Sequence, residues 1–318
     1  MSQSARWEQL SEAGSRTSLE IARWIVQSLG RRVGVVVAAA AATYFMLRRG
    51  SGRRASRRYL ERVAAVPEGR KALGREQPGV TSVWRHFFEI SLSVLDRIVV
   101  WSGALDAMEL THDGSEEIFA LADAGRGALI LGAHIGNLDM LGFVARQHDL
   151  VVNVVAYYHN AERINAFLQS LGNEQVRVLE RDPDSIQTAL RVRACLERGE
   201  FVVVLADRVA PGGAERTEAV PFLGDPARFP FGPFLLAATL GYPVYLSLCV
   251  CTGNARYTAV MRPIAAEPKR TPRAERDRRA HELLTRYVAL LEEVCVRYPF
   301  QWFNFFDFWE DEGRGDGA

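Results

Sequence analysis

A histidine and an aspartate five residues apart, His134 and Asp139, are the side chains whose types and spacing could do chemistry. On a continuous helix the two would lie about 140° apart around the axis, so they can meet only where the chain turns between them. Gly136 permits such a turn, and Asn137 can cap a helix that places Asp139 in its first turn. The sequence therefore predicts a strand, a tight turn and a helix start over residues 128–145, with a carboxylate aimed at an imidazole.

This pair suits proton abstraction from a hydroxyl or an amine. A neutral imidazole can act as general base, while a carboxylate on its other ring nitrogen fixes the tautomer and stabilises the imidazolium. No serine or cysteine stands beside His134, so the substrate itself would be the nucleophile and no covalent enzyme intermediate is expected. A histidine at a strand end is also often hydrogen-bonded to an aspartate for structural reasons alone, and spacing does not separate the two interpretations.

The elements around this pair predict an α/β fold. Apolar runs typical of strands alternate with helical patterns after the pair: strands at 151–156, 176–179 and 201–206, helices at 161–171 and 183–198. Such alternation favours a mainly parallel sheet flanked by helices, with sites at the carboxyl ends of strands. His134 and the neighbours Asp207 and Arg208 all follow predicted strands. Further strands are expected at 242–250 and 257–261, and helices at 81–101 and 272–298.

Charge and cysteine usage narrow the class of partner. The 318 residues carry 39 basic and 38 acidic side chains, a net charge of +1, which gives no indication of nucleic acid binding. The charges are unevenly spread, because residues 48–75 hold ten basic side chains and two acidic ones, a balance suited to an anionic surface. The four cysteines show no metal-ligand spacing and agree with a reducing compartment.

The most apolar run, residues 33–47, lies just before this basic segment. Its 15 residues are fewer than the roughly 20 that span a bilayer core, so the run could span with snorkelling arginines or lie shallow in the interface. A buried core helix is a third interpretation, and an export signal is disfavoured by the arginines that follow. We expect a membrane-anchoring segment over residues 1–60 and a catalytic domain over residues 61–318.

The motif at residues 134–139 resembles the H-x4-D motif of the lysophospholipid acyltransferase superfamily. The order of later blocks is similar to the bacterial late lipid A biosynthesis acyltransferases: VLADR at 204–208, VPFLG at 220–224, FPFGP at 229–233 and LLAATLGYPV at 235–244. The ending QWFNFFDFW at 301–309 is most similar to a branch of that family found in aryl polyene lipid pathways. The resemblance implies a glycerolipid acyltransferase-like α/β fold with an N-terminal membrane-associated helix.

By this resemblance, the enzyme is an O-acyltransferase that uses His134 as general base and Asp139 as its orienting partner. The donor would be a thioester of acyl carrier protein or coenzyme A, used as a cosubstrate with no further cofactor, and the acceptor a hydroxyl of a lipid or glycolipid. The expected location is the bacterial inner membrane, with the catalytic domain on the cytoplasmic face. The residues expected to bind substrate, through backbone amides, guanidinium groups or other polar side chains, are Gly136, Asn137, Arg163, Asp207, Arg208, Phe222, Gly224 and Asn304.

One further segment and two alternative functions complete the expectations. The aromatic residues 299–309 either wall an acyl-chain groove or dock in the core, and the pattern favours the core. A metal-dependent hydrolase could use His134, Asp139, His159 and Asp207 as ligands, although no usual metal-ligand spacing occurs. A non-catalytic lipid-binding protein would need the same apolar and basic segments without His134.

Overall fold

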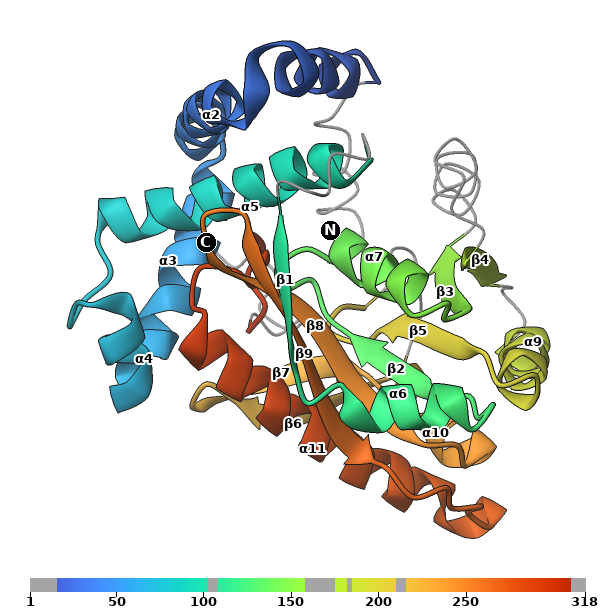
Figure 1. Ribbon diagram of the computed structural model, residues 1–318. Coiled ribbons are helices and arrows are strands. Elements are labelled where there is room, and N and C mark those ends of the chain that lie inside the picture. The colour runs from blue at the N-terminus through green and yellow to red at the C-terminus, as the bar shows by residue number, and fades with distance from the viewer. Residues whose placement is uncertain (1–15, 102–107, 158–174, 182–184, 210–215, 310–318) are drawn as a thin grey trace.

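A seven-stranded sheet forms the centre of the computed structural model, which describes residues 16–101, 108–157, 175–181, 185–209 and 216–309 (Figure 1). The strand order is β1-β9-β8-β2-β5-β3-β4. Strands β8, β2, β5, β3 and β4 run parallel, whereas β9 is antiparallel to β8 and β1 is parallel to β9. The bounds are β1 (Glu109–Asp113), β2 (Leu129–Gly132), β3 (Val152–Tyr157), β4 (Val176–Arg181), β5 (Phe201–Leu205), β8 (Val244–Gly253) and β9 (Arg256–Ala265).

Helices cover both faces of this sheet. Alternate residues of β2 point to opposite layers: Leu129 and Leu131 pack in the cluster that contains α10 and α11, and Ile130 packs with α6 and α7. The mostly parallel α/β fold expected from the sequence is confirmed. The helices are α2 (Arg16–Arg48), α3 (Gly50–Ala65), α4 (Pro67–Leu73), α5 (Val80–Trp101), α6 (Glu116–Asp123), α7 (Asp139–Gln147), α9 (Ser185–Glu197), α10 (Gly232–Leu240) and α11 (Arg276–Arg297).

A separate hairpin, β6 (Thr217–Phe222) and β7 (Asp225–Pro230), packs beside the sheet. Its turn places Leu223 and Gly224 at φ 51° and 88°. The helix expected at residues 161–171 lies outside the described residues. The domain division expected at residue 60 falls inside α3 and stays a prediction.

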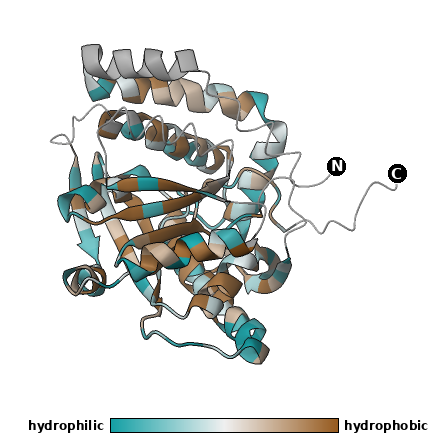
Figure 2. Cartoon of the chain, turned by 90° about the vertical axis from the view of Figure 1, so that its right-hand side faces the viewer, coloured by the Kyte–Doolittle hydropathy of each residue, from teal (hydrophilic) through white to brown (hydrophobic). Residues whose placement is uncertain are grey.

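Helices α2 and α5 form a layer at one end of the molecule, where α5 lies between the sheet and α2 (Figure 1 and Figure 2). Helix α2 is kinked at Gly30, whose φ of 78° and ψ of 167° are accessible mainly to glycine. Within the described residues, one helical stretch, Gly30–Arg48, is long and apolar enough to cross a membrane by length and composition. A near-terminal stretch of this kind is weak evidence for a membrane helix.

A buried histidine, His86, ties this N-terminal layer to the C-terminal segment. Its Nε2 donates to the carbonyl of Trp302 at 2.8 Å, so Nδ1 is the acceptor for the Ser56 hydroxyl at 2.9 Å. Burial lowers the pKa of His86 to about 4, against a weaker opposing effect of the hydrogen bond to Trp302. The neutral ring is therefore the form that this packing requires.

This histidine should make the fold sensitive to acid. Because the folded-state pKa lies below the ordinary 6.5, the unfolded chain takes up the proton first, and stability is lost as pH falls from 6.5 towards 4. Between pH 7 and pH 5 the contribution is about 2 kcal/mol of unfolding free energy. Urea titrations of the wild type and of His86→Gln, which keeps a donor for the Trp302 carbonyl, measure it. The variant should lose clearly less stability over this range, and equal losses would contradict the assignment.

Candidate active site

The imidazole of His134 is held by the carboxylate of Asp207. Nδ1 lies 2.8 Å from Oδ1, and the backbone N–H of His134 donates to Oδ2 at 3.0 Å. An ionised carboxylate can only accept hydrogen bonds, so Nδ1 carries the proton and Nε2, on the other edge of the ring, is the basic atom. The His134 side chain is 35% exposed, whereas that of Asp207 is fully buried.

The sheet explains why these two residues meet. Strands β2 and β5 are parallel neighbours, with Leu131 opposite Val204 and Gly132 opposite Leu205. His134 lies two residues after Gly132, and Asp207 lies two residues after Leu205. The two residues are therefore side by side at the carboxyl ends of neighbouring strands. The backbone of Ala206 also donates to the carbonyl of Gly132 at 3.0 Å, which continues the pairing beyond the strands.

The C-terminal residues Trp302 and Phe303 also hydrogen-bond to Asp207 and His134. Trp302 is fully buried and its Nε1 donates to Asp207 Oδ2 at 3.1 Å. Its backbone bridges to Ile135, and Phe303 N–H donates to the carbonyl of His134 at 2.9 Å. The expected docking of the aromatic segment in the core is confirmed at Trp302 and Phe308.

The charges around His134 favour its neutral form. Burial lowers its pKa, and the nearby positive charge of Arg208 lowers it further, whereas Asp207 raises it without reversing the result. For Asp207, burial alone would raise the pKa, but the His134 charge and hydrogen bonds and the Arg208 charge hold it well below its usual range. The pair is therefore an ionised carboxylate beside a neutral imidazole at neutral pH.

Asp139 lies elsewhere in this arrangement. It is the first residue of α7, as expected, and its Oδ2 is 2.5 Å from Nε of Arg97 on α5. The carboxylate that accepts from His134 Nδ1 is that of Asp207, and not that of Asp139 as the motif indicated. The physical reason is that the turn after β2 points the Asp139 carboxylate towards α5, while sheet pairing brings Asp207 to the imidazole.

The turn between His134 and Asp139 is formed by Gly136 and Asn137. Gly136 has a φ of 64°, and a Cβ there would lie 1.9 Å from the carbonyl oxygen of Cys249, so glycine is required. Asn137 is fully buried, and its Oδ1 accepts from Asp139 N–H at 3.2 Å, so it binds the first amide of α7 although the N-cap position itself is Leu138. The two backbone amides donate to Gln301 and Cys249 carbonyls at 2.9 and 2.8 Å. These two amides are therefore already hydrogen-bonded within the protein and are not available for the substrate binding expected of Gly136 and Asn137.

Arg208 and Asn304 flank the histidine pair. One guanidinium nitrogen of Arg208 donates to the carbonyl of Phe303, and its Nε lies 3.9 Å from Asp207 Oδ2. Burial lowers the pKa of Arg208, against the charge of Asp207. Arg208 Nε and Asn304 Oδ1 are buried atoms without a hydrogen-bond partner among the described residues. Both side chains thus retain unused polar atoms.

Phe222, at the end of β6, packs against Trp302 beside the site, whereas Gly224 in the following turn is exposed. The Phe222 ring is fully buried and lies edge-on to Trp302, with centroids 5.3 Å apart. Leu223 N–H in the same turn donates to Glu292 at 2.5 Å, so this amide is also occupied. The structure gives this turn a packing role against Trp302.

Two residues proposed from the sequence, Arg163 and His159, lie outside the described residues. Among the residues that the structure does describe, no group of three or more histidine, cysteine or acidic side chains could hold a metal ion.

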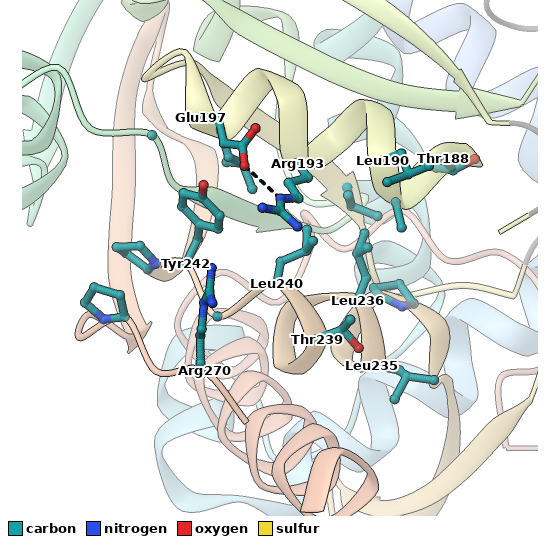
Figure 3. Close-up of a pocket in the computed structure, with 18 of the residues that line it drawn as sticks. Thr188, Leu190, Arg193, Glu197, Leu235, Leu236, Thr239, Leu240, Tyr242 and Arg270 are labelled. Atoms are coloured by element: carbon teal, nitrogen blue, oxygen red, sulfur yellow. Dashed lines mark hydrogen bonds and ion pairs between the residues drawn. The ribbon is translucent and has the colours of Figure 1, made fainter. Parts of the chain in front are cut away.

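A cavity of about 1130 Å³ opens between α9 and α10 (Figure 3). Leucines from both helices line it, including Leu190, Leu236 and Leu240, and its rim carries Arg270 and the ion pair of Arg193 with Glu197. Its wall also includes Val155 of β3 and Val204 of β5. Val204 lies three residues before Asp207 in the chain. One wall of the cavity is therefore formed by β5, the strand that positions Asp207 beside His134.

Fold and site together define an α/β protein that presents a basic imidazole nitrogen at the carboxyl edge of its sheet. The family model of bacterial lipid A biosynthesis acyltransferases matches residues 17–310, and the chain therefore belongs to that family. Membership implies acyltransferase activity, with an acyl donor and a lipid acceptor. A search of curated proteins found no match to the sequence.

Proposed function

We propose that this protein transfers an acyl group from a thioester of acyl carrier protein or coenzyme A to a hydroxyl of a lipid or glycolipid. The observation that carries the proposal is the hydrogen bond of His134 Nδ1 to Asp207, which leaves Nε2 as the base on a partly exposed ring. Family membership supports the same chemistry.

The reaction is a sequential transfer in one site. The acceptor O–H gives its proton to His134 Nε2 as its oxygen attacks the thioester carbonyl carbon. The tetrahedral intermediate then loses the C–S bond, and the departing thiolate takes the proton from the imidazolium. Asp207 stabilises the imidazolium while it exists.

Arg208 is the candidate anion-binding residue of this reaction. Its side chain is 21% exposed and lies beside the histidine pair, and a guanidinium binds phosphate well. We propose that it binds a phosphate of the acceptor or of the donor's phosphopantetheine arm. The roles proposed for Arg163 and Asn304 in substrate binding stay predictions.

The cavity between α9 and α10 suits the donor's acyl chain. Its apolar walls suit a hydrocarbon chain. Val204, one of the lining residues, belongs to β5, the strand that ends two residues before Asp207. We place the enzyme at the bacterial inner membrane, with its catalytic domain on the cytoplasmic face. We also propose that it belongs to the branch of the family found in aryl polyene lipid pathways.

The proposal is tested by supplying labelled acyl groups on acyl carrier protein and, separately, on coenzyme A to the full-length protein with extracted membrane lipids. Label should enter a lipid from one of the donors, and the labelled product identifies the acceptor class. Absence of transfer from both donors, or trapping of an acylated protein, contradicts the proposed mechanism.

The rate should keep its neutral-pH value at mildly acidic pH. Because burial and Arg208 lower the pKa of His134, the base stays unprotonated below the ordinary 6.5, and kcat/KM falls only as pH drops through the lowered pKa. A profile from pH 5 to 8, with tryptophan fluorescence as a check of folding, measures this. A half-maximal rate above pH 6.5 would be incompatible with the geometry described.

A further inference from the structure

One side of α2 beyond Gly30 is apolar and exposed. We call this side the outer face, and its most exposed members are Val36 at 69%, Leu47 at 66% and Tyr44 at 56%. Val36 and Tyr44 are eight residues apart and Tyr44 and Leu47 are three apart, spacings that place all three on a single helix face. The hydroxyl of Thr43, which is exposed near them, is already hydrogen-bonded to Ala39 and Trp84. The outer face consists of Val33, Val36, Val37, Ala40, Tyr44 and Leu47.

The opposite side of the same helix is packed on α5. Gly34, Ala38, Ala42 and Met46 recur every four residues and are buried. A Cβ on Gly34 would lie 2.7 Å from a methyl carbon of Leu95, so the helices approach closely at this point. This side of α2 is therefore buried against α5.

Polar contacts fix the two helices at both ends. Arg31 donates to both carboxylate oxygens of Asp96 at 2.8 and 2.9 Å, and Trp84 Nε1 donates to Thr43 at 2.9 Å. Asp96 is fully buried and also accepts from Tyr257 at 2.7 Å. Detaching α2 would leave the Asp96 charge in the interior without its cation, which is strongly unfavourable.

Helix α5 is in turn attached to the catalytic turn. Ser93 donates to the carbonyl of Gly136 at 3.0 Å, and Arg97 pairs with Asp139. If α2 crossed a bilayer while still packed on α5, the buried Arg31–Asp96 pair and these attachments would have to enter the hydrocarbon with it. Charged groups are expensive in that environment.

We propose that α2 lies in the plane of a membrane, with its outer face in the interfacial region of an anionic lipid surface, and does not span the bilayer. Exposed Arg32 and Arg48 stand at the two ends of the outer face, and Arg54 is exposed on the following helix. Their positive charge complements anionic lipid headgroups, while the valines and Leu47 enter the acyl boundary. Tyr44 is a residue type that membrane interfaces favour.

This arrangement has a consequence for the transfer reaction, which rests on the proposed function. Helix α5 is the single layer between α2 and the turn that follows β2, and packed helices have axes about 8–10 Å apart. The His134 site is therefore one helix layer away from the lipid surface. An acceptor lipid needs only to rise partly from the bilayer to reach it.

Binding of the full-length protein to vesicles of phosphatidylcholine and phosphatidylglycerol tests the surface without any acyl donor, so the result is independent of the proposed reaction. Val36→Glu and Leu47→Glu should each weaken binding at least about tenfold. Ala289→Glu is the matched control for the added charge, because Ala289 is exposed on α11 and does not line the cavity between α9 and α10, and it should bind as the wild type does. Wild-type binding by Val36→Glu, or a lipid-free dimer that this substitution abolishes, overturns the proposal.

Orientation is tested with Arg32→Cys and Arg48→Cys in reconstituted vesicles. A membrane-impermeant maleimide added outside the vesicles should label residue 32 in one variant and residue 48 in the other to the same extent. Labelling of the wild type, which has four native cysteines, gives the background to subtract. Labelling of only one position from outside, with the other reached after the vesicles are opened, shows a spanning helix and overturns the proposal.

Discussion

Replacement of His134 by alanine is expected to lower kcat for acyl transfer at least about a hundredfold, because the reaction loses its general base. The fold should survive, since the backbone N–H of residue 134 still donates to Asp207 and Trp302 still donates to the same carboxylate. Transfer of labelled acyl groups under saturating donor and acceptor measures the effect. Thermal unfolding of the variant is the control.

A His134→Ala enzyme that keeps more than a tenth of the wild-type kcat would show that the imidazole is structural. A fall in rate with an unchanged unfolding temperature places the loss in the chemistry. Lipid binding measured on the same preparation distinguishes the acyltransferase from a non-catalytic lipid-binding protein. In the second case both the wild type and the variant bind vesicles, but neither transfers label.

Asp207→Asn is expected to lower kcat by about a thousandfold, although the substitution keeps the shape of the side chain. Oδ2 of Asp207 accepts two hydrogen bonds, from His134 N–H and Trp302 Nε1, so the asparagine oxygen will occupy that position. Its amide nitrogen then faces Nδ1 and donates to it. The imidazole is thereby held as the tautomer with its proton on Nε2, which cannot act as a base.

Asp139→Asn is the comparison variant. Its carboxylate pairs with Arg97, so this substitution should affect the turn and α5 and reduce kcat much less than Asp207→Asn does. The motif interpretation from sequence requires the opposite ranking. Kinetics of the two variants at pH 7.5, each checked by thermal unfolding, therefore decide which aspartate orients His134.

Local chemistry made part of this site predictable from sequence. The strand before His134 follows from a short apolar run, and the turn follows from Gly136, whose positive φ and contact with Cys249 exclude a side chain. The hydrogen bond from the first amide of α7 to Asn137 and the position of Asp139 in the first helical turn depend on neighbours within a few residues. Such features are encoded in the segment itself.

The partner of His134 was not predictable in the same way. Asp139 is near in sequence, whereas Asp207 is brought in by the order of strands β2 and β5, which an alternating pattern does not specify. His134 and Asp207 were both recognised as following predicted strands, so the register of those two strand ends was the available signal. The hold of α5 on the catalytic turn, through Ser93 and Arg97, had no signal in the sequence pattern.

The attachment of residues 301–303 to the catalytic turn also sets when the site can exist during folding. Gln301 hydrogen-bonds both backbone groups of Cys251, and Trp302 and Phe303 complete the surroundings of His134 from 168 positions further along the chain. Closing a loop of this length has a conformational-entropy cost, which the contacts of residues 301–303 must offset. A chain that has formed β2 and β5 without these contacts has the Asp207 hydrogen bond to His134 but lacks those from Trp302 and Phe303. The surroundings of the imidazole are therefore complete only when residues 301–303 are in place.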